Sequence, residues 1–280
     1  MTAPLLEVAN LRVSFRTPRG VTAAVRGVSF SMGREKLGIV GESGSGKTLT
    51  GRSILRLLPP GAELQATRLT FDGVDLMAAT PARLRELRGL RLAMVMQDPK
   101  FSLNPVMPVG DQIAEAYLAH SRASRVEARE KALAMLEAVR IREPQRVYAL
   151  YPHEVSGGMG QRIMIAMMLA PDPDLLVADE PTSALDVTVQ MQVLAILDDL
   201  VSERGMGLVF ISHDLTLVAS FCDRVLVMYG GRVVETLDAR ALARAQHPYT
   251  RGLIACLPQL SGTEGDLPVL SRDPAWLDAT

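Results

Sequence analysis

Two stretches near the start of the chain show the pattern of antiparallel β-strands. Apolar residues alternate with polar ones at Leu11, Val13 and Phe15, and a second run rich in apolar residues covers positions 21 to 30. The sequence Pro18–Gly20 between them is typical of a tight turn. The pattern therefore predicts a small antiparallel β element at the start of the chain.

Short apolar runs alternate with helical periodicity along the rest of the chain. The runs are too short for buried helices and are typical of strands covered on both faces. Strands are expected at Leu37–Val40, Leu92–Met96, Leu175–Ala178, Leu208–Ile211 and Val225–Met228, and helices at Leu49–Leu58, Val109–Ala119, Val126–Val139 and Val187–Glu203. This alternation predicts an α/β fold with a parallel sheet. From about Ala245 onward the sequence reads as a tail.

Composition narrows the class of protein. The 280 residues are 48% hydrophobic and 22% charged, as in ordinary globular proteins, and are enough for one large domain or two modest ones. The formal net charge is -1, so nucleic acid is not an expected partner. Cys222 and Cys256 lack the spacing of metal ligands. No apolar run is long enough to cross a membrane, so membrane association is expected to go through a partner.

A glycine-rich loop follows the strand expected at Leu37–Val40. It fits the phosphate-binding pattern GxxxxGK[ST], with a strand before it and a helix after it, as that mechanism requires. The alternative is a chance surface turn. Backbone N–H groups would face the phosphates of ATP, Lys47 would reach the β- and γ-phosphates, and Thr48 would bind Mg²⁺. The expected ATP contacts are Gly41, Glu42, Ser43, Gly44, Ser45, Gly46, Lys47, Thr48 and Leu49.

Two carboxylates end the apolar strand Leu175–Ala178. Ligands bind at strand ends in such sheets. Asp179 is therefore expected to hold Mg²⁺ through water, and Glu180 to act as the general base that activates the attacking water. A solvated acidic strand end is the plainer alternative. With the glycine-rich loop, these residues predict a nucleoside triphosphatase.

Further motifs resemble those of ATP-binding cassette (ABC) proteins. The segment Val155–Arg162 resembles the family signature LSGGQ, with Val155 in place of Leu and Met159 in place of Gln. Taken alone, Ser-Gly-Gly could equally be the cap of a helix. The family's other motifs appear in family order, with Gln97 as its Q-loop, Ser183–Asp186 as its D-loop and His213 as its switch histidine.

This resemblance implies a composite site built by two cassettes arranged head to tail. Ser156, Gly157, Gly158 and Asp186 would then serve the nucleotide of the partner cassette. Gln97 would contact Mg²⁺ and take part in catalysis together with His213. Phe15 would stack on adenine, although a core aromatic on an alternating strand is the alternative.

The implied fold is an ABC-type P-loop ATPase core with a small antiparallel β subdomain and an inserted α-helical subdomain. The domain would span residues 1–245, with the insertion at about 98–164 and a tail at 246–280. The helical subdomain's groove would receive a coupling helix from a membrane subunit. A soluble ABC ATPase acting on DNA or ribosomes, or a P-loop kinase or GTPase, remains the alternative.

Four short motifs resemble the ATPase subunits of importers for di- and oligopeptides or nickel. They are Gln97–Pro99 with Ser102–Pro105, the Met159 variant of the signature, Leu150–His153 and His247–Thr250. The implied partners are a second ATPase subunit, identical or different, two membrane permease subunits and an external solute-binding protein. The chain would lie peripherally on the cytoplasmic face of the membrane. Relatives often carry a cysteine cluster in the tail, but this tail has Cys256 alone, so no iron–sulfur cluster is expected. Nothing in the sequence selects peptide over nickel.

Overall fold

The computed structural model describes residues 3–18, 20–96, 102–183, 185–256 and 276. The chain forms two compact units, one made of Met1–Ala78 and Phe210–Thr280 and the other of Ala79–Val209. The helical segment expected at about 98–164 falls within the second unit. The secondary structure of each unit is α/β, as the sequence predicts.

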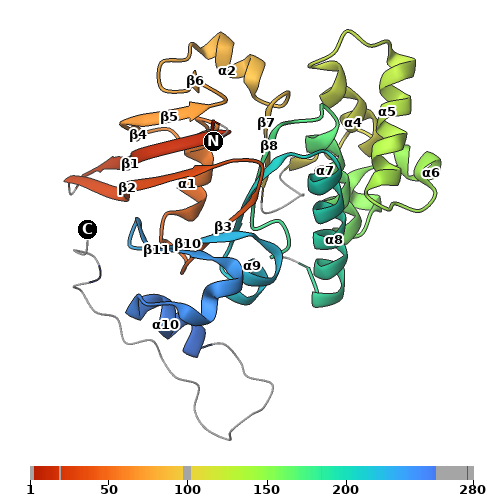
Figure 1. Ribbon diagram of the computed structural model, residues 1–280. Coiled ribbons are helices and arrows are strands. Elements are labelled where there is room, and N and C mark those ends of the chain that lie inside the picture. Colours follow the sequence, from red (N-terminus) through yellow and green to blue (C-terminus); the bar gives the residue numbers. More distant parts are fainter. Residues whose placement is uncertain (1–2, 19, 97–101, 184, 257–275, 277–280) are drawn as a thin grey trace, which may run out of the picture. The chain divides into compact units, whose positions relative to one another are not determined.

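The first unit begins with the expected antiparallel sheet (Figure 1). Its strands follow the order β2-β1-β5-β6, and β4 also pairs with β1. Leu11 and Val13, from the alternating pattern, are fully buried. The strands are β1 (Leu6–Thr17), β2 (Gly20–Met32), β4 (Ala62–Gln65), β5 (Arg68–Phe71) and β6 (Val74–Asp75).

The rest of the first unit is built on β3 (Lys36–Val40) and β10 (Arg224–Tyr229), which run parallel to each other. The strand β11 (Arg232–Asp238) pairs antiparallel with β10. Helix α9 (Leu215–Phe221) packs so closely on β3 that a Cβ at Gly38 would lie 2.2 Å from a Val218 methyl group. The Cys222 thiol beside it is buried, which raises its pKa to about 12.

Helix α1 (Lys47–Ile54) follows the glycine-rich loop and is shorter than predicted. The apolar pattern extends to Leu58, but the helix is capped at Leu55. The next residue, Arg56, has a φ of 53°, a left-handed conformation that cannot continue a right-handed helix. Backbone conformation therefore ends α1 before Pro59 does.

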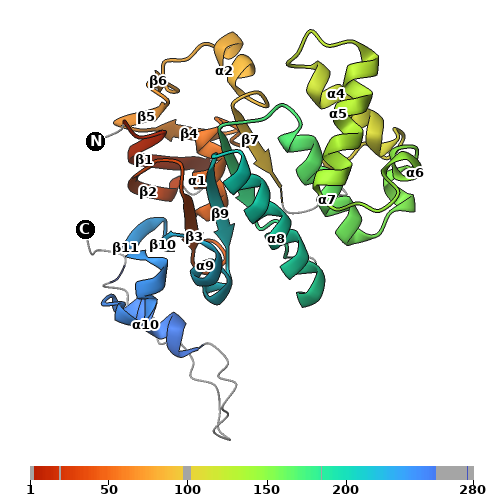
Figure 2. The ribbon, with the colours of Figure 1, turned by 45° about the vertical axis from the view of Figure 1, so that its right-hand side comes forward.

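Residues beyond Ala245 do not all behave as a tail. Helix α10 (Pro248–Ala255) follows the hairpin of β10 and β11 at the blue end of the chain in Figure 1 and Figure 2, and the ring of its Tyr249 packs on that of Tyr229 in β10. Its Tyr249 side chain is fully buried. The folded part of the first unit therefore extends past the expected boundary at residue 245.

The second unit combines two parallel strands with a group of helices. Leu92 of β7 pairs with Leu175 of β8, and all residues of both strands are buried. Among the residues that the structure describes, no helix is long and apolar enough to cross a membrane. The elements are α2 (Pro81–Leu87), β7 (Leu92–Val95), α4 (Val109–Leu118), α5 (Arg125–Ala138), α6 (Pro144–Tyr148), α7 (Gly157–Leu169), β8 (Leu175–Asp179) and α8 (Val187–Glu203); β9 (Gly207–Ser212) then leads back to the first unit.

Candidate nucleotide site

The glycine-rich loop connects β3 to α1, and its backbone packs closely against the backbone of β2 and β10. A Cβ at Gly41 would lie 2.1 Å from the carbonyl oxygen of Met228, and one at Gly46 would lie 2.8 Å from the carbonyl oxygen of Ala24. Gly46 also has a φ of 97° where α1 begins. Both positions therefore require glycine because backbone atoms approach too closely for a side chain.

The loop presents donors that fit a nucleotide's phosphates. No side chain caps α1 at Gly46. The N–H groups that begin a helix have no partner within the helix itself and are suited to an anion. The Lys47 side chain is only 5% exposed, and its Nζ donates to the carbonyl oxygens of Gly41 at 2.7 Å and Glu42 at 2.9 Å. The buried Ser45 hydroxyl has no hydrogen-bond partner among the residues that the structure describes. A buried cation and an unpaired hydroxyl are suited to a bound polyphosphate.

The other expected loop contacts differ in exposure. Ser43 and Gly44 are exposed, and Glu42, Thr48 and Leu49 are half-buried. Phe15 is half-buried on β1, opposite Thr22 and Ala62, and is not part of the buried core. Its ring can therefore contact a ligand, as the stacking hypothesis requires.

The acidic strand end belongs to the second unit. Asp179, the last residue of β8, is only 4% exposed, whereas Glu180 is half-buried. Glu180 has a φ of 48°, which is unusual for a residue with a side chain and occurs often at functional sites. Ser183 donates to the Glu180 carbonyl oxygen through both its backbone N–H, at 3.3 Å, and its hydroxyl, at 3.2 Å. The turn after β8 therefore fixes this conformation.

The signature segment caps α7. The Ser156 hydroxyl accepts a hydrogen bond from the backbone N–H of Met159 at 3.3 Å, so the capping interpretation is correct as far as it goes. Ser156 and Gly157 nevertheless stay exposed at the start of the helix. Gly158 packs against α8, because a Cβ there would lie 2.5 Å from a methyl group of Val189. The segment thus combines a structural role with a surface that a second protein can reach.

Gly158→Ala is expected to lower the free energy of unfolding by about 1–3 kcal/mol, the usual cost of overpacking. Val189 is β-branched and cannot easily rotate its methyl group away from the new Cβ. Removing that group in Gly158→Ala/Val189→Ala should restore most of the lost stability, as measured by urea unfolding with Val189→Ala as the reference. Equal stability of Gly158→Ala and the wild type would show that the two helices are packed differently.

Asp186 and His213, two further motif residues, have clear local positions. Asp186 caps α8, since its Oδ1 accepts from the backbone N–H of Val189 at 3.0 Å, and its side chain is exposed. His213 is exposed just after β9 in the first unit. Gln97 lies outside the described residues. The loop, Phe15 and His213 thus belong to one unit, and Asp179, Glu180, the signature and Asp186 to the other.

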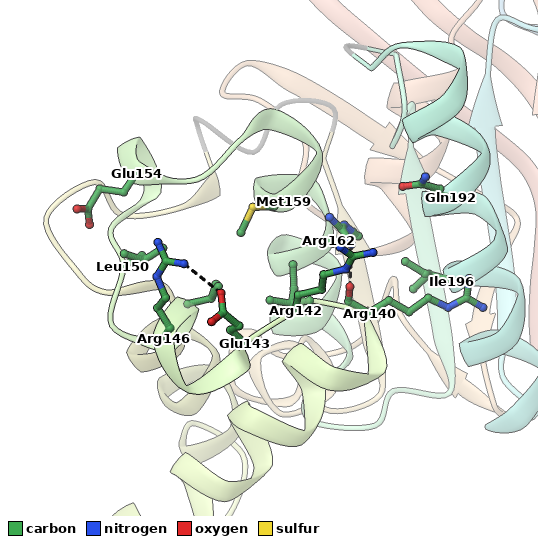
Figure 3. Close-up of a pocket in the computed structure, with 12 residues that line it drawn as sticks. Arg140, Arg142, Glu143, Arg146, Leu150, Glu154, Met159, Arg162, Gln192 and Ile196 are labelled. Atoms are coloured by element: carbon green, nitrogen blue, oxygen red, sulfur yellow. Dashed lines mark hydrogen bonds and ion pairs between the residues drawn. The ribbon is translucent and has the colours of Figure 1, made fainter.

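A cavity of about 720 Å³ lies within the second unit, between the segment before the signature and α8 (Figure 3). Arg146 pairs with Glu143 at 3.0 Å, and Arg162 donates to the Arg140 carbonyl oxygen at 3.0 Å. Burial lowers the pKa of the Arg162 guanidinium. The walls are formed by apolar and charged residues together, namely Arg140, Ile141, Arg142, Glu143, Arg146, Val147, Leu150, Glu154, Met159, Arg162, Gln192 and Ile196.

Sequence reasoning missed one contact of the loop. The hydroxyl oxygen of Tyr249, on α10, accepts a hydrogen bond from the backbone N–H of Glu42 at 3.1 Å. The His247–Thr250 motif marked this region without indicating what it does. A contact between residues so far apart in sequence leaves no local pattern, so only the motif itself could have drawn attention to it.

Comparison with known proteins identifies the family. Residues 25–183, more than half of the chain, match the family model described as ABC transporter. The chain is 51% identical over 268 residues to the probable peptide ABC transporter ATP-binding protein y4tR of Sinorhizobium fredii (strain NBRC 101917 / NGR234), covering 94% of this chain and 80% of that protein. It is 48% identical over 269 residues to the glutathione import ATP-binding protein GsiA of Escherichia coli O157:H7, covering 93% of this chain. It spans only 43% of the length of GsiA.

A solved structure agrees with these relatives. The dimeric post-hydrolysis state of the ATP-binding cassette MJ0796, bound to ADP and Pi, matches with a TM-score of 0.74 at 25% identity. The match covers 84% of this chain and 99% of that one. The P-loop kinase and GTPase alternative is thereby excluded. The chain therefore belongs to the ABC transporter family and is an ATPase of the ATP-binding cassette type.

Proposed function

We propose that this chain powers the import of peptides by hydrolysing ATP beneath a membrane permease. The observation that carries the proposal is the 51% identity, over 94% of the chain, with a probable peptide ABC transporter subunit. Glutathione, named for GsiA, is itself a small peptide. Both relatives favour peptide over the nickel that the sequence motifs left open.

The residues of this chain supply binding and proton transfer. Lys47 and the N–H groups that begin α1 hold the phosphates, and the unpaired Ser45 hydroxyl adds a buried polar contact. Bound ATP supplies the phosphoanhydride bond that is broken. Glu180 accepts the proton of the attacking water, and His213 assists catalysis at the γ-phosphate, as the resemblance to the family implies. Phe15 stacks on the adenine ring.

Mg²⁺ fits the donors that the chain offers. This ion prefers oxygen ligands and is usually bound by one or two carboxylates or hydroxyls together with substrate phosphates and water. Asp179 and Thr48 provide a carboxylate and a hydroxyl of that kind, and Gln97 would add an amide oxygen. Among the described residues no group of three or more acidic, histidine or cysteine side chains forms a metal site of its own. The ion is therefore expected to bind together with the nucleotide.

A second cassette completes the site. Ser156 and Gly157 are exposed at the start of α7, where they are accessible to the nucleotide of another subunit, and Asp186 is exposed at the start of α8. The related cassette MJ0796 was solved as a dimer. We infer that two ATPase subunits, identical or different, pair head to tail in the same way. The signature and Asp186 of each then contribute to the ATP site of the other.

The cavity before the signature supports a contact with the permease. Its apolar residues offer a surface for one face of a short helix, and its arginines offer hydrogen bonds to carbonyl or carboxylate oxygens (Figure 3). Two such permease subunits would hold the ATPase on the cytoplasmic face of the membrane. The external solute-binding protein and the permeases, which face the cargo, would select the peptide.

Reconstitution with the permease subunits and a solute-binding protein in lipid nanodiscs tests the proposal. The ATPase rate should rise when a transported peptide is added with the binding protein, and nickel should have no effect. A rate that ignores the membrane subunits, or responds to nickel alone, would contradict peptide import. Duplex DNA or ribosomes that raise the rate of the isolated chain would favour the alternative of a soluble ABC ATPase.

Leu150→Arg tests the permease contact separately. Leu150 lines the cavity, so a cationic side chain there should abolish co-purification with the permeases. Val126→Arg is the matched control, because Val126 is 67% exposed and does not line the cavity. Co-purification of the Leu150→Arg variant at the wild-type level would move the docking site elsewhere.

A further inference from the structure

A buried tyrosine from α10 reaches the phosphate-binding loop of the same unit. The Tyr249 side chain has no exposed surface, and its hydroxyl oxygen accepts the hydrogen bond from the Glu42 N–H at 3.1 Å. The two residues are 207 positions apart. The loop thus depends for one backbone hydrogen bond on a helix outside all the motifs that bind nucleotide.

The same stretch of loop holds the lysine. Lys47 Nζ donates to the carbonyl oxygens of Gly41 and Glu42, while Tyr249 holds the N–H of Glu42. The peptide group between Gly41 and Glu42 is therefore bonded on both sides, to the tyrosine through its N–H and to the lysine through its carbonyl. Any movement of this peptide group moves an acceptor that orients the ammonium.

Tyr249 is itself fixed in place. Its ring packs on that of Tyr229, with centroids 4.5 Å apart at an interplanar angle of 43°. The Glu235 carboxylate accepts from the backbone N–H groups of Gln246 at 2.7 Å and His247 at 3.3 Å, which fixes the turn into α10. His247 Nδ1 then accepts from the Tyr249 N–H at 3.2 Å and caps the helix. The hydroxyl therefore meets the loop from a rigid support.

We propose that Tyr249 is a positioning residue for nucleotide binding, which sets the Gly41–Glu42 peptide group and, through it, Lys47. The inference rests on the proposed role of the loop as the phosphate site. Tyr249 acts on the loop through the backbone N–H of Glu42 and not through a contact with the nucleotide. Without the hydroxyl, the partly buried Glu42 N–H loses this hydrogen bond. Losing a hydrogen bond at a partly buried donor costs free energy, so the loop shifts toward another acceptor. That shift misplaces the lysine.

Tyr249→Phe tests the proposal, because it removes the hydroxyl and keeps the ring. The Kd for MgATP, measured on the full chain by isothermal titration calorimetry, should rise about tenfold. At saturating ATP the kcat should stay within about twofold of the wild type, since no reacting group changes. Tyr229→Phe is the matched control: it deletes a hydroxyl from the same ring pair without touching the loop, and should bind MgATP as the wild type does.

Other results of these titrations would overturn the proposed role of Tyr249. An unchanged Kd for Tyr249→Phe overturns the proposal, and so does an equal rise for Tyr229→Phe, which would assign the effect to ring packing. If Tyr249→Phe does not fold, Glu235→Gln loosens the turn into α10 with the hydroxyl intact. It should raise the Kd in the same direction, and an unchanged Kd overturns the proposal. Lys47→Ala distinguishes a failure of this proposal from a failure of the proposed phosphate site. If Lys47→Ala binds MgATP as the wild type does, the phosphate site itself is wrongly assigned.

Discussion

Glu180→Gln is expected to lower the rate of ATP hydrolysis by about 10² or more, the usual contribution of a general base. The amide keeps the size and polarity of the side chain but cannot accept the proton of the attacking water. ATP binding should persist, because the proposed phosphate contacts lie in the glycine-rich loop and not at Glu180. Steady-state phosphate release measures the first effect and calorimetry the second.

Dimer formation gives Glu180→Gln a second readout, because ATP that is bound but not hydrolysed stays in the site. If two cassettes close around ATP and reopen only after hydrolysis, Glu180→Gln should accumulate as a dimer in the presence of MgATP. Size-exclusion chromatography with light scattering would detect that dimer, and ADP should not induce it. The wild type, which turns ATP over, should remain mostly monomeric under the same conditions.

Glu203→Gln is the matched control, since Glu203 is an exposed glutamate at the end of α8. It should hydrolyse ATP at the wild-type rate. Residue 180 has a left-handed φ of 48°, and glutamine tolerates that backbone conformation no worse than glutamate. A loss of activity therefore cannot come from new backbone strain. Turnover near that of the wild type would remove Glu180 from the role of general base.

The parts of the site with local chemistry could be predicted from the sequence. The glycine-rich loop lies between a strand and a helix, as its pattern requires, and Asp179 ends a strand whose apolar run is short and continuous. Helix α8 covers the residues that its periodicity predicts, and it begins after Asp186, whose side chain caps it. In each case the residues that decide the structure are neighbours in the chain.

The parts that depend on distant contacts could not be predicted. The need for glycine at position 41 comes from the Met228 carbonyl oxygen, and that of Gly158 comes from Val189. Helix α10 belongs to the folded unit because Tyr249 is buried, whereas its local sequence reads as a tail. Local periodicity contains no information about such contacts. The early end of α1 at Arg56 is likewise a matter of backbone conformation that apolar periodicity does not indicate.

Lys47→Ala is expected to weaken MgATP binding by a factor of about 10 to 150. The estimate follows from the 1.5–3 kcal/mol typical of a hydrogen bond to a charged group. The variant removes the ammonium of a residue that is only 5% exposed. Calorimetric titration with MgATP measures the loss.

Lys131→Ala separates this effect from a general loss of positive charge. Lys131 forms an ion pair with Asp172 at 2.6 Å on the second unit, and such partly exposed pairs contribute about 1 kcal/mol or less to stability. Its MgATP affinity should equal that of the wild type. Thermal unfolding without nucleotide then shows whether Lys47→Ala is folded, since the Gly41 and Glu42 carbonyl oxygens lose a donor in that variant.

The comparison with ADP makes the test of Lys47 specific. A lysine that reaches both the β- and γ-phosphates should contribute to the binding of both nucleotides, and more to that of ATP. The affinity ratio of ATP to ADP should therefore fall in Lys47→Ala and stay constant in Lys131→Ala. If Lys47→Ala keeps its affinity for both nucleotides while remaining folded, the phosphates do not lie in the loop from Gly41 to Thr48.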